Sequence, residues 1–373
     1  MRHYNNYMPV EIISGKDCVK NFEKYKKLGN KCFIVTGKNV SRCCEVINHL
    51  TAVLDKQDIE YEIFKDVENN PSVETVIKAA ALAINFGAEF IIGAGGGSPM
   101  DAAKAIALVC ANNVTAEDIF TNKYENKPLP LILIGTTAGT GSEVTAAAVL
   151  TTVSNGTLIK KTLKTSNSYA DYALCDPQYT CSLPAKVTVS TALDSISHAI
   201  EAYFSKKGGQ FARVYAIEAL QTVMPALDAF ITDNNNDEQV REKLLYGSIM
   251  AGMAINNGGT SFPHTLGYVL TTMHNIPHGV ACAIFIGEFL KRVDKVESVN
   301  EVIKAAGEKS IDDFSNKLRK WASICCDIPE LTEKELQVFC DIGIQMPNIE
   351  NSIILHVTRN DCEEIYKNVC GLK

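Results

Sequence analysis

The feature that most constrains the fold is an alternation of short apolar segments and helical segments in the first half of the chain. Strand-like segments cover 31–37, 60–64, 89–95 and 130–137, and helical patterns cover 73–87 and 98–110. Strands that alternate with helices pair in parallel, because a parallel crossover leaves room for a helix. Continuous apolar strands further indicate a sheet covered on both faces. We therefore predict an α/β domain with a parallel, Rossmann-like sheet.

After about residue 180 long helical patterns dominate. They cover 188–205, 210–230, 238–256, 280–292, 296–306, 311–323 and 332–342. A length of 373 residues also suits two domains better than one compact core. We predict an α/β domain over residues 1–180 and an all-helical domain over residues 181–373. A cleft between two domains is a usual place for a ligand.

Charge and cysteine usage exclude several classes of protein. The net charge is −7, whereas binding to nucleic acid needs clustered Lys and Arg. The 13 cysteines are scattered without a CxxC pair, which favours a reducing compartment. The first 15 residues lack the apolar run of a signal peptide, and we find no apolar run of membrane-spanning length. We expect a cytoplasmic protein with neither nucleic acid nor a membrane as partner.

A glycine-rich loop, GAGGGSPMD at 93–101, follows an apolar strand and opens a helix. Gly93 and Gly95 fit a G-x-G-x-x-G fingerprint, but Ser98 stands at its third glycine. Ser98 and Asp101 also form an S-x-x-D capping pattern, with Ser98 as N-cap. Free backbone N–H groups and the dipole at a helix start favour a phosphate. The alternative is a tight strand-to-helix turn without a ligand.

A second loop of the same kind, TTAGTGSEVT at 136–145, also follows an apolar strand. It is rich in Gly, Thr and Ser. Two phosphate-type loops after separate strands suit a dinucleotide better than either loop alone. The α/β domain is therefore predicted to bind a dinucleotide.

The segment 190–204 reads as an amphipathic helix that carries a candidate pair of metal ligands. Asp194 and His198 are four residues apart, so they lie one turn apart on one helix face and can reach the same ion. Two alternatives remain for this pair. Thr191-x-x-Asp194 is also a plausible capping pattern, and a histidine on a polar face is ordinary.

Three of the seven histidines fall in SFPHTLGYVLTTMHNIPHG, residues 261–279. His264 and His278 each follow a proline, which restricts the local backbone. Together with Asp194 and His198 they supply three imidazoles and one carboxylate, a set of ligands suited to Zn²⁺ or Fe²⁺. His274 is ambiguous: a loop histidine, a group behind the ligands, or a third ligand.

These motifs together resemble the iron-containing (group III) alcohol dehydrogenases. The similarity rests on GGGSPMD, TTAGTGSEVT, the D-x-x-x-H of LDSISHAIEAY, and the PHTLGY and IPHG histidines, fourteen residues apart. It extends in order from about residue 8 to beyond residue 290. The resemblance implies a dehydroquinate-synthase-like fold, a homodimer or larger assembly, and a cofactor that meets a metal in the interdomain cleft.

The resemblance also assigns residues. The family's four metal ligands match Asp194, His198, His264 and His278. Its cofactor contacts match Asn70, Gly96, Gly97, Ser98, Asp101, Thr136, Thr137, Thr140, Thr145 and Lys160.

The chain departs from the family pattern after the first strand. Many members carry an acidic residue there, which holds the adenosine ribose, whereas this chain has Gly37. An aspartate would repel a 2′-phosphate, and Lys38 and Arg42 lie close enough in sequence to pair with one. We therefore expect NADP(H) to be favoured over NAD(H), with Gly37 and Lys38 at the cofactor.

Two further departures concern the proton and the cofactor. Where many members have a histidine proposed to relay the proton, this chain has Tyr268, so Tyr268 and His274 are the candidate catalytic residues. A usual asparagine is replaced by Ala147.

The resulting hypothesis is a metal-dependent oxidoreductase. The metal acts as a Lewis acid toward the oxygen of a short-chain alcohol or aldehyde, and hydride passes to or from the nicotinamide. The resemblance favours Fe²⁺, although glycerol dehydrogenase, a member of the same superfamily, uses zinc. No thiol chemistry is needed, and Cys282 reads as a buried helix residue.

Two rival functions remain. A dehydroquinate-synthase-like lyase would need several basic residues for its phosphorylated acid substrate, but the segments flanking the ligands carry no Lys or Arg. A non-catalytic metal- or nucleotide-binding protein would use the same binding residues, so only turnover distinguishes it.

Overall fold

The computed structural model describes residues 6–38, 40–112, 114–121, 124–154, 157–293, 296–352 and 357–373, without the side chains of 40–44, 154, 157 and 158. The chain forms two compact units. The sheet unit comprises Met8–Thr137 and Gly141–Leu183. The helical unit comprises Ala138–Thr140 and Pro184–Lys373, together with Asn6 and Tyr7. The second glycine-rich loop is therefore shared between the units.

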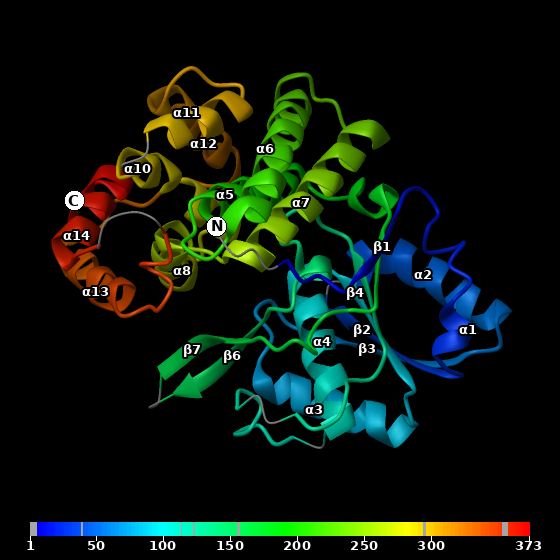
Figure 1. Ribbon diagram of the computed structural model, residues 1–373. Coiled ribbons are helices and arrows are strands. Elements are labelled where there is room, and N and C mark those ends of the chain that lie inside the picture. Colours follow the sequence, from blue (N-terminus) through cyan, green and yellow to red (C-terminus); the bar gives the residue numbers. More distant parts are fainter. Residues whose placement is uncertain are drawn as a thin grey trace. The chain divides into compact units, whose positions relative to one another are not determined.

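The sheet unit is built on six strands in the order β1-β8-β5-β4-β2-β3, and every pair among them is parallel (Figure 1). This confirms the predicted parallel sheet. The strands are β1 (Glu11–Ser14), β2 (Lys31–Gly37), β3 (Glu60–Val67), β4 (Phe90–Gly95), β5 (Leu131–Gly135) and β8 (Tyr172–Cys175). The helices are α1 (Tyr25–Leu28), α2 (Val40–Lys56), α3 (Val73–Phe86) and α4 (Gly97–Asn112), with the 3₁₀ helices η1 (Ser142–Val144) and η2 (Pro177–Thr180).

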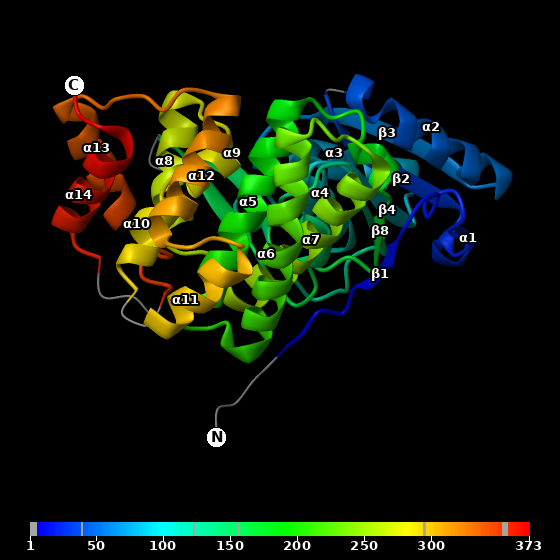
Figure 2. The same cartoon turned by 90° about the horizontal axis from the view of Figure 1, so that it is seen from above.

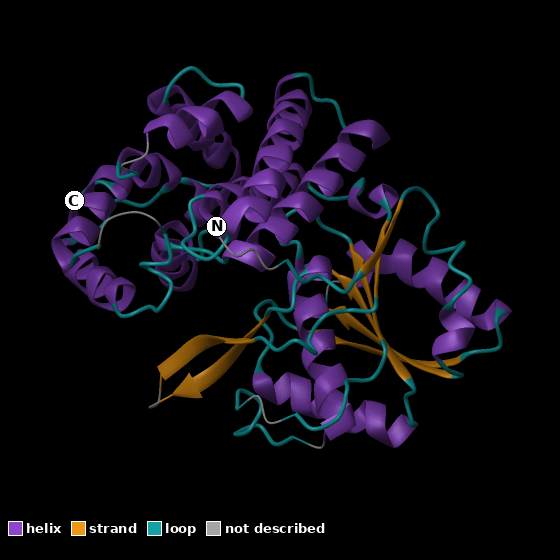
Figure 3. Ribbon diagram, in the orientation of Figure 1, coloured by secondary structure: helices purple, strands orange, loops and turns teal. Residues whose placement is uncertain are grey.

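An antiparallel hairpin, β6 (Ala148–Ser154) and β7 (Thr157–Leu163), stands apart from the six-stranded sheet (Figure 3). This hairpin was not predicted from the sequence. Its polar and apolar residues do not alternate regularly enough to indicate a strand pair.

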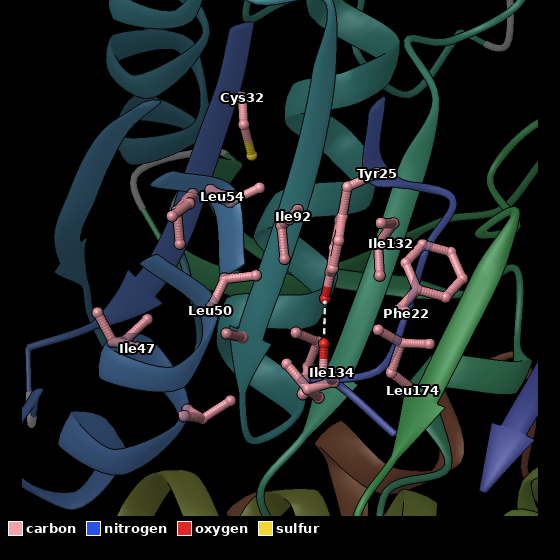
Figure 4. Close-up of a cluster of buried hydrophobic side chains, with 14 of the residues drawn as sticks. Phe22, Tyr25, Cys32, Ile47, Leu50, Leu54, Ile92, Ile132, Ile134 and Leu174 are labelled. Atoms are coloured by element: carbon pink, nitrogen blue, oxygen red, sulfur yellow. Dashed lines mark hydrogen bonds between the residues drawn. The ribbon is translucent and has the colours of Figure 1, made fainter. Parts of the chain in front are cut away.

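Both faces of the sheet are buried, as the continuous apolar strands predict. On one face, Ile34, Ile92 and Ile132 pack with α1 and α2 in the core cluster drawn in Figure 4. On the other face α4 lies so close to β4 that a Cβ at Gly93 would meet the Ala103 Cβ at 2.6 Å. A glycine at this point therefore allows the close packing of strand and helix that a dinucleotide-type turn needs.

The helical unit contains α5 (Ala185–Tyr203), α6 (Gly209–Thr232), α7 (Glu238–Gly258), α8 (Phe262–His274), α9 (His278–Ala283), α10 (Ile286–Lys291), α11 (Val296–Ala305), α12 (Ile311–Cys325), α13 (Glu333–Ile344) and α14 (Arg359–Cys370). Helices α5, α6 and α7 lie side by side (Figure 2). This agrees with the predicted helical second half. The predicted single helix over 280–292 is wrong, because the chain there forms α9 and α10. Helices α8 and α14 were not predicted.

Helix α6 is long and apolar enough to cross a membrane by length and composition. This differs from the expectation of no apolar run of membrane-spanning length, because polar residues interrupt the apolar run of α6. Its buried residues include Leu220, Val223 and Leu227, and it packs against α5 and α7. We interpret α6 as a core helix of the helical unit.

Candidate functional site

The four predicted metal ligands come from three helices of the helical unit. Asp194 and His198 lie one turn apart inside α5, which begins at Ala185. Asp194 is therefore not a capping residue, and that alternative is wrong. His264 lies in the first turn of α8, and His278 is the first residue of α9. The prolines before these two histidines stand at helix starts, where a missing N–H costs nothing.

The structure brings these four side chains together. The Nε2 atoms of three histidines approach Asp194 Oδ1: His264 at 3.4 Å, His198 at 3.6 Å and His278 at 3.8 Å. Asp194, His198 and His264 are buried, whereas the side chain of His278 is 32% exposed. The cluster is thus mostly enclosed, with one side open at His278.

Close packing of α9 on α5 positions His278. A Cβ at Gly279 would lie 1.8 Å from Ser190 O and 2.8 Å from Asp194 N, which no side chain can occupy. Only glycine lets the start of α9 approach α5 this closely. The glycine after His278 is therefore needed to place the imidazole beside the carboxylate.

The charges of the cluster favour a cation. Burial raises the pKa of Asp194, but His198, His278 and His264 outweigh it and hold that pKa well below its ordinary value. Burial lowers the pKa of His198. Burial also acts to lower the pKa of His264, but Cys282, Glu201 and Asp194 outweigh it and raise that pKa well above its ordinary value. Asp194 is therefore ionised, the form in which a carboxylate binds a metal, whereas an ion that binds here must displace a proton from His264.

Two polar atoms of the cluster that lack hydrogen-bond partners also indicate a bound Fe²⁺ or Zn²⁺ ion. Asp194 Oδ1 and His264 Nε2 are buried, and neither has a hydrogen-bond partner within the described part of the chain. Buried polar atoms without partners are costly unless another group satisfies them. Three imidazoles and one carboxylate suit either ion.

Glu201 supports this cluster, and the sequence analysis missed it. It is fully buried in α5, and its Oε1 accepts a hydrogen bond from His264 Nδ1 at 2.5 Å. Its Oε2 accepts from the backbone N–H of Ser261 at 2.6 Å. A carboxylate behind a histidine fixes the tautomer that leaves Nε2 free for a metal. Its spacing, seven residues after Asp194, is the signal that would have placed it on the same helix face.

Of the two candidate relay residues, only Tyr268 lies at the cluster. Its ring stacks on that of His278, with centroids 5.0 Å apart and an interplanar angle of 12°. His274 instead packs against Phe339 of α13, and its Nε2 is 3.4 Å from Glu335 Oε1. The structure therefore does not bring His274 into the cluster.

Cys282 also lies at the cluster, although the sequence indicates only a buried helix residue. It is fully buried, and its ligand atom lies within 4.8 Å of those of Asp194, His264 and His278. Burial raises the pKa of the Cys282 thiol to about 11, against the lowering effect of His264.

In the sheet unit, the first glycine-rich loop leads from β4 into α4. The helix begins at Gly97, so Ser98 is not its N-cap, and its hydroxyl accepts a hydrogen bond from the Asn70 backbone instead. Asp101 does not complete a capping pattern: its carboxylate accepts from Ser142 Oγ at 2.6 Å and from the Val149 backbone at 2.9 Å. The predicted capping box is therefore wrong, and Asp101 joins the two loops.

Lys104, which the sequence analysis did not select, strengthens this junction. It is fully buried, and its Nζ donates to Ser142 Oγ and to Ala147 O, each at 2.7 Å. Burial lowers the pKa of Lys104, and Asp101 and Glu143 oppose that shift. The lysine and Asp101 hold the start of α4 against the second loop.

The remaining predicted cofactor residues surround these loops. The hydroxyl of Thr137 is buried without a hydrogen-bond partner among the described residues, and a Cβ at Gly96 would lie 3.5 Å from it. An unsatisfied hydroxyl beside a glycine suits a phosphate oxygen. Thr136 and Thr145 are buried at the two ends of the second loop, and Asn70 adopts a left-handed conformation. Gly37 is the last residue of β2, and Lys38 follows it.

Two further predicted cofactor residues are Thr140 and Lys160. Thr140 lies in the part of the second loop that belongs to the helical unit, and Lys160 lies on the hairpin, where it pairs with Thr151. The side chain of Arg42, the proposed partner of a 2′-phosphate, lies outside the described residues.

A parallel sheet with two glycine-rich loops and a cluster of three imidazoles with one carboxylate characterise a metal-dependent dehydrogenase. A family model for iron-containing alcohol dehydrogenases matches residues 9–177, and one for the C-terminal part of the Fe-containing family matches 188–345. The chain therefore belongs to the iron-containing alcohol dehydrogenase family, which confirms the resemblance seen in its sequence.

Individual relatives agree with this assignment. The NADPH-dependent butanol dehydrogenase of Clostridium saccharobutylicum is 30% identical over 325 residues, which is 84% of this chain and 82% of the relative. A solved iron-containing alcohol dehydrogenase of Thermotoga maritima is 32% identical with a TM-score of 0.87, covering 99% of this chain and all of that one. Sulfoacetaldehyde reductase of Bifidobacterium kashiwanohense, solved with NAD⁺, is 28% identical with a TM-score of 0.88, covering 99% of each chain.

Proposed function

We propose that this protein is a metal-dependent, NAD(P)-linked alcohol dehydrogenase or aldehyde reductase that acts on short-chain substrates. The observation that carries the proposal is the approach of three imidazole nitrogens to one buried carboxylate oxygen. A fold alone does not define a reaction. This set of ligand atoms indicates a reaction in which a divalent ion takes part.

We assign the ligand roles to Asp194, His198, His264 and His278. When bound, a divalent ion supplies Lewis acidity toward an alcohol or carbonyl oxygen, and a nicotinamide accepts or supplies the hydride. Fe²⁺ is our first choice from the family, with Zn²⁺ as the alternative. The exposed edge of His278 gives a substrate its access to the centre.

The chain's own residues orient the ligands and handle the proton. Glu201 keeps the proton of His264 on Nδ1. We assign the proton relay to Tyr268, because its ring stacks on His278. His274, which pairs with Glu335, is the weaker candidate.

We propose that NADP(H) is favoured over NAD(H). A Cβ at Gly37 would meet only ordinary contacts at 3.5 Å, so an aspartate fits there without strain. We expect Gly37→Asp to shift the ratio of kcat/KM values toward NADH at least about tenfold, because a carboxylate repels the 2′-phosphate and binds a ribose hydroxyl. An unchanged ratio would contradict the assignment of Gly37 to the ribose site.

The reaction itself is tested by turnover. The protein is purified without oxygen and loaded with Fe²⁺ or Zn²⁺, and oxidation of NADPH and NADH is followed with a panel of short aldehydes. We expect metal-dependent oxidation that His278→Ala abolishes. His49→Ala is the matched control, because His49 is hydrogen-bonded to Tyr179 in the sheet unit and is not part of the cluster.

The rival functions give different results in the same assay. Tight metal binding without turnover of any aldehyde, with either cofactor, would refute the dehydrogenase and favour a lyase or a binding protein.

We also propose that the protein is a homodimer in the cytoplasm. Light scattering after size-exclusion chromatography tests the oligomeric state. The cysteines with described side chains form no disulfide with one another, which supports the proposed reducing compartment.

A further inference from the structure

Cys282 lies one helical turn after His278 on α9 and is fully buried. Its Sγ is 3.7 Å from His278 Nδ1 and 3.9 Å from His278 Nε2. Positions four apart on a helix lie on one face, so the thiol and the imidazole turn toward the same region.

The distances suit a common ion. With metal–nitrogen bonds of about 2.0 Å and metal–sulfur bonds of about 2.3 Å, neighbouring donor atoms around one five-coordinate ion lie roughly 2.8–3.7 Å apart. The ligand atoms of Asp194, His264, His278 and Cys282 all lie within 4.8 Å of one another. The sulfur therefore needs only a small shift to reach the ion that the three others hold.

A second observation points to a ligand at the same place. Asp194 Oδ1 and His264 Nε2 are buried and lack hydrogen-bond partners in the part of the chain that the structure describes. The Cys282 sulfur lies within 4.8 Å of a ligand atom of each of these two residues. Polar groups that lack partners are rare in a protein interior unless they serve a ligand.

We propose that Cys282 is a fifth donor of the metal centre and binds the ion as a thiolate. When the ion binds, the S–H bond breaks, a sulfur–metal bond forms, and the proton leaves to solvent, with no change of oxidation state. Thiolate is a soft ligand, so the centre prefers Zn²⁺ and Co²⁺ over Mn²⁺ more strongly than an all-nitrogen and oxygen site would. This inference rests on the proposed metal site.

The first test uses Co²⁺ as a spectroscopic probe. The metal-free protein is titrated with Co²⁺ while the visible d–d bands and the near-ultraviolet thiolate-to-cobalt charge-transfer band are recorded. We expect both in the unmodified protein. In Cys282→Ala we expect the d–d bands alone, and a loss of Co²⁺ affinity of roughly tenfold or more. Cys362→Ala removes another fully buried thiol of the helical unit and keeps both signals.

A second measurement needs no variant, in case Cys282→Ala fails to fold. X-ray absorption at the zinc edge of the zinc-loaded protein should show one sulfur neighbour at about 2.3 Å. Bound cobalt without a charge-transfer band, or a zinc shell of nitrogen and oxygen only, overturns the role of Cys282 and leaves the proposed dehydrogenase intact. Failure of the unmodified protein to bind either ion overturns both proposals.

Discussion

Replacing Glu201 by glutamine tests how the metal centre is held. The carboxylate accepts one hydrogen bond from His264 Nδ1 and one from the Ser261 backbone. A glutamine oxygen still accepts from Ser261, but its NH₂ group cannot accept from His264 Nδ1. His264 must then turn its Nδ1 lone pair to the amide and carry the proton on Nε2. The nitrogen that faces Asp194 is thereby lost to the ion.

The expected magnitude follows from this change of tautomer. Removing the partner behind a metal-binding histidine costs about 10–100-fold in metal affinity, which is about 1.4–2.8 kcal/mol. Glu201→Ala should cost more stability, because it leaves three buried donors, the backbone N–H groups of Ser261 and His264 and the His264 Nδ1–H, without this acceptor, at about 1–3 kcal/mol each. Glu201→Gln should therefore lower the metal affinity while keeping more of the stability than Glu201→Ala does.

The assay is a competition for Zn²⁺ between the protein and a chromophoric chelator, with urea unfolding of the metal-free forms alongside. Glu143→Gln is the matched control. Glu143 is also buried, its pKa is raised by burial, and it belongs to the sheet unit. We expect its zinc affinity to match that of the unmodified protein. A Glu201→Gln variant whose zinc affinity stays within twofold of the unmodified protein would refute the orienting role of Glu201.

Three further predictions concern packing and charge. Gly279→Ala should lower stability by about 1–3 kcal/mol and weaken zinc binding, because its Cβ collides with Ser190 O. Gly37→Ala is the control and should leave the zinc affinity unchanged. Equal zinc affinities of the Gly279→Ala and Gly37→Ala variants would contradict this prediction. Lys104→Met should destabilise the protein by about 3 kcal/mol in urea unfolding, since it breaks a buried charge network, and should raise the Kd for NADPH; a stable variant with unchanged Kd would refute it. Burial raises the folded-state pKa of Glu143, so above the unfolded pKa the native state holds a proton that the unfolded state has lost, and stability falls as pH rises. Unfolding at pH 4 and pH 7 should therefore favour Glu143→Gln increasingly toward pH 7, and a pH-independent difference would count against it.

The sequence predicts what local periodicity and chain order determine. The parallel sheet follows from strand and helix alternation, and the shared face of Asp194 and His198 follows from the helical repeat. The two proline-preceded histidines of residues 261–279 indicate His264 and His278 as further ligands, and the family resemblance matches both. Their approach to one carboxylate depends on the left-handed Asn275 that ends α8 and on the packing of Gly279, neither of which a sequence pattern reveals.

The roles of buried polar residues were the least predictable part of the site. Asp101 fits a capping pattern in the sequence, yet its carboxylate binds the second loop. Glu201 and Lys104 look like ordinary charged residues of amphipathic helices, and their importance appears only when their partners are known. Burial of a charge is a tertiary property, because it depends on elements distant in sequence.

The arrangement of the ligands on three separate helices has a consequence for variants throughout the helical unit. Because α5, α8 and α9 each contribute part of the centre, the bound ion cross-links three segments and stabilises the native state in proportion to the logarithm of its free concentration. A change at Gly267, whose Cβ would lie 2.7 Å from Ala281 O, would separate α8 from α9 and be recognised first as low metal content. The amount of metal that copurifies with a variant is thus a measure of how well these helices pack.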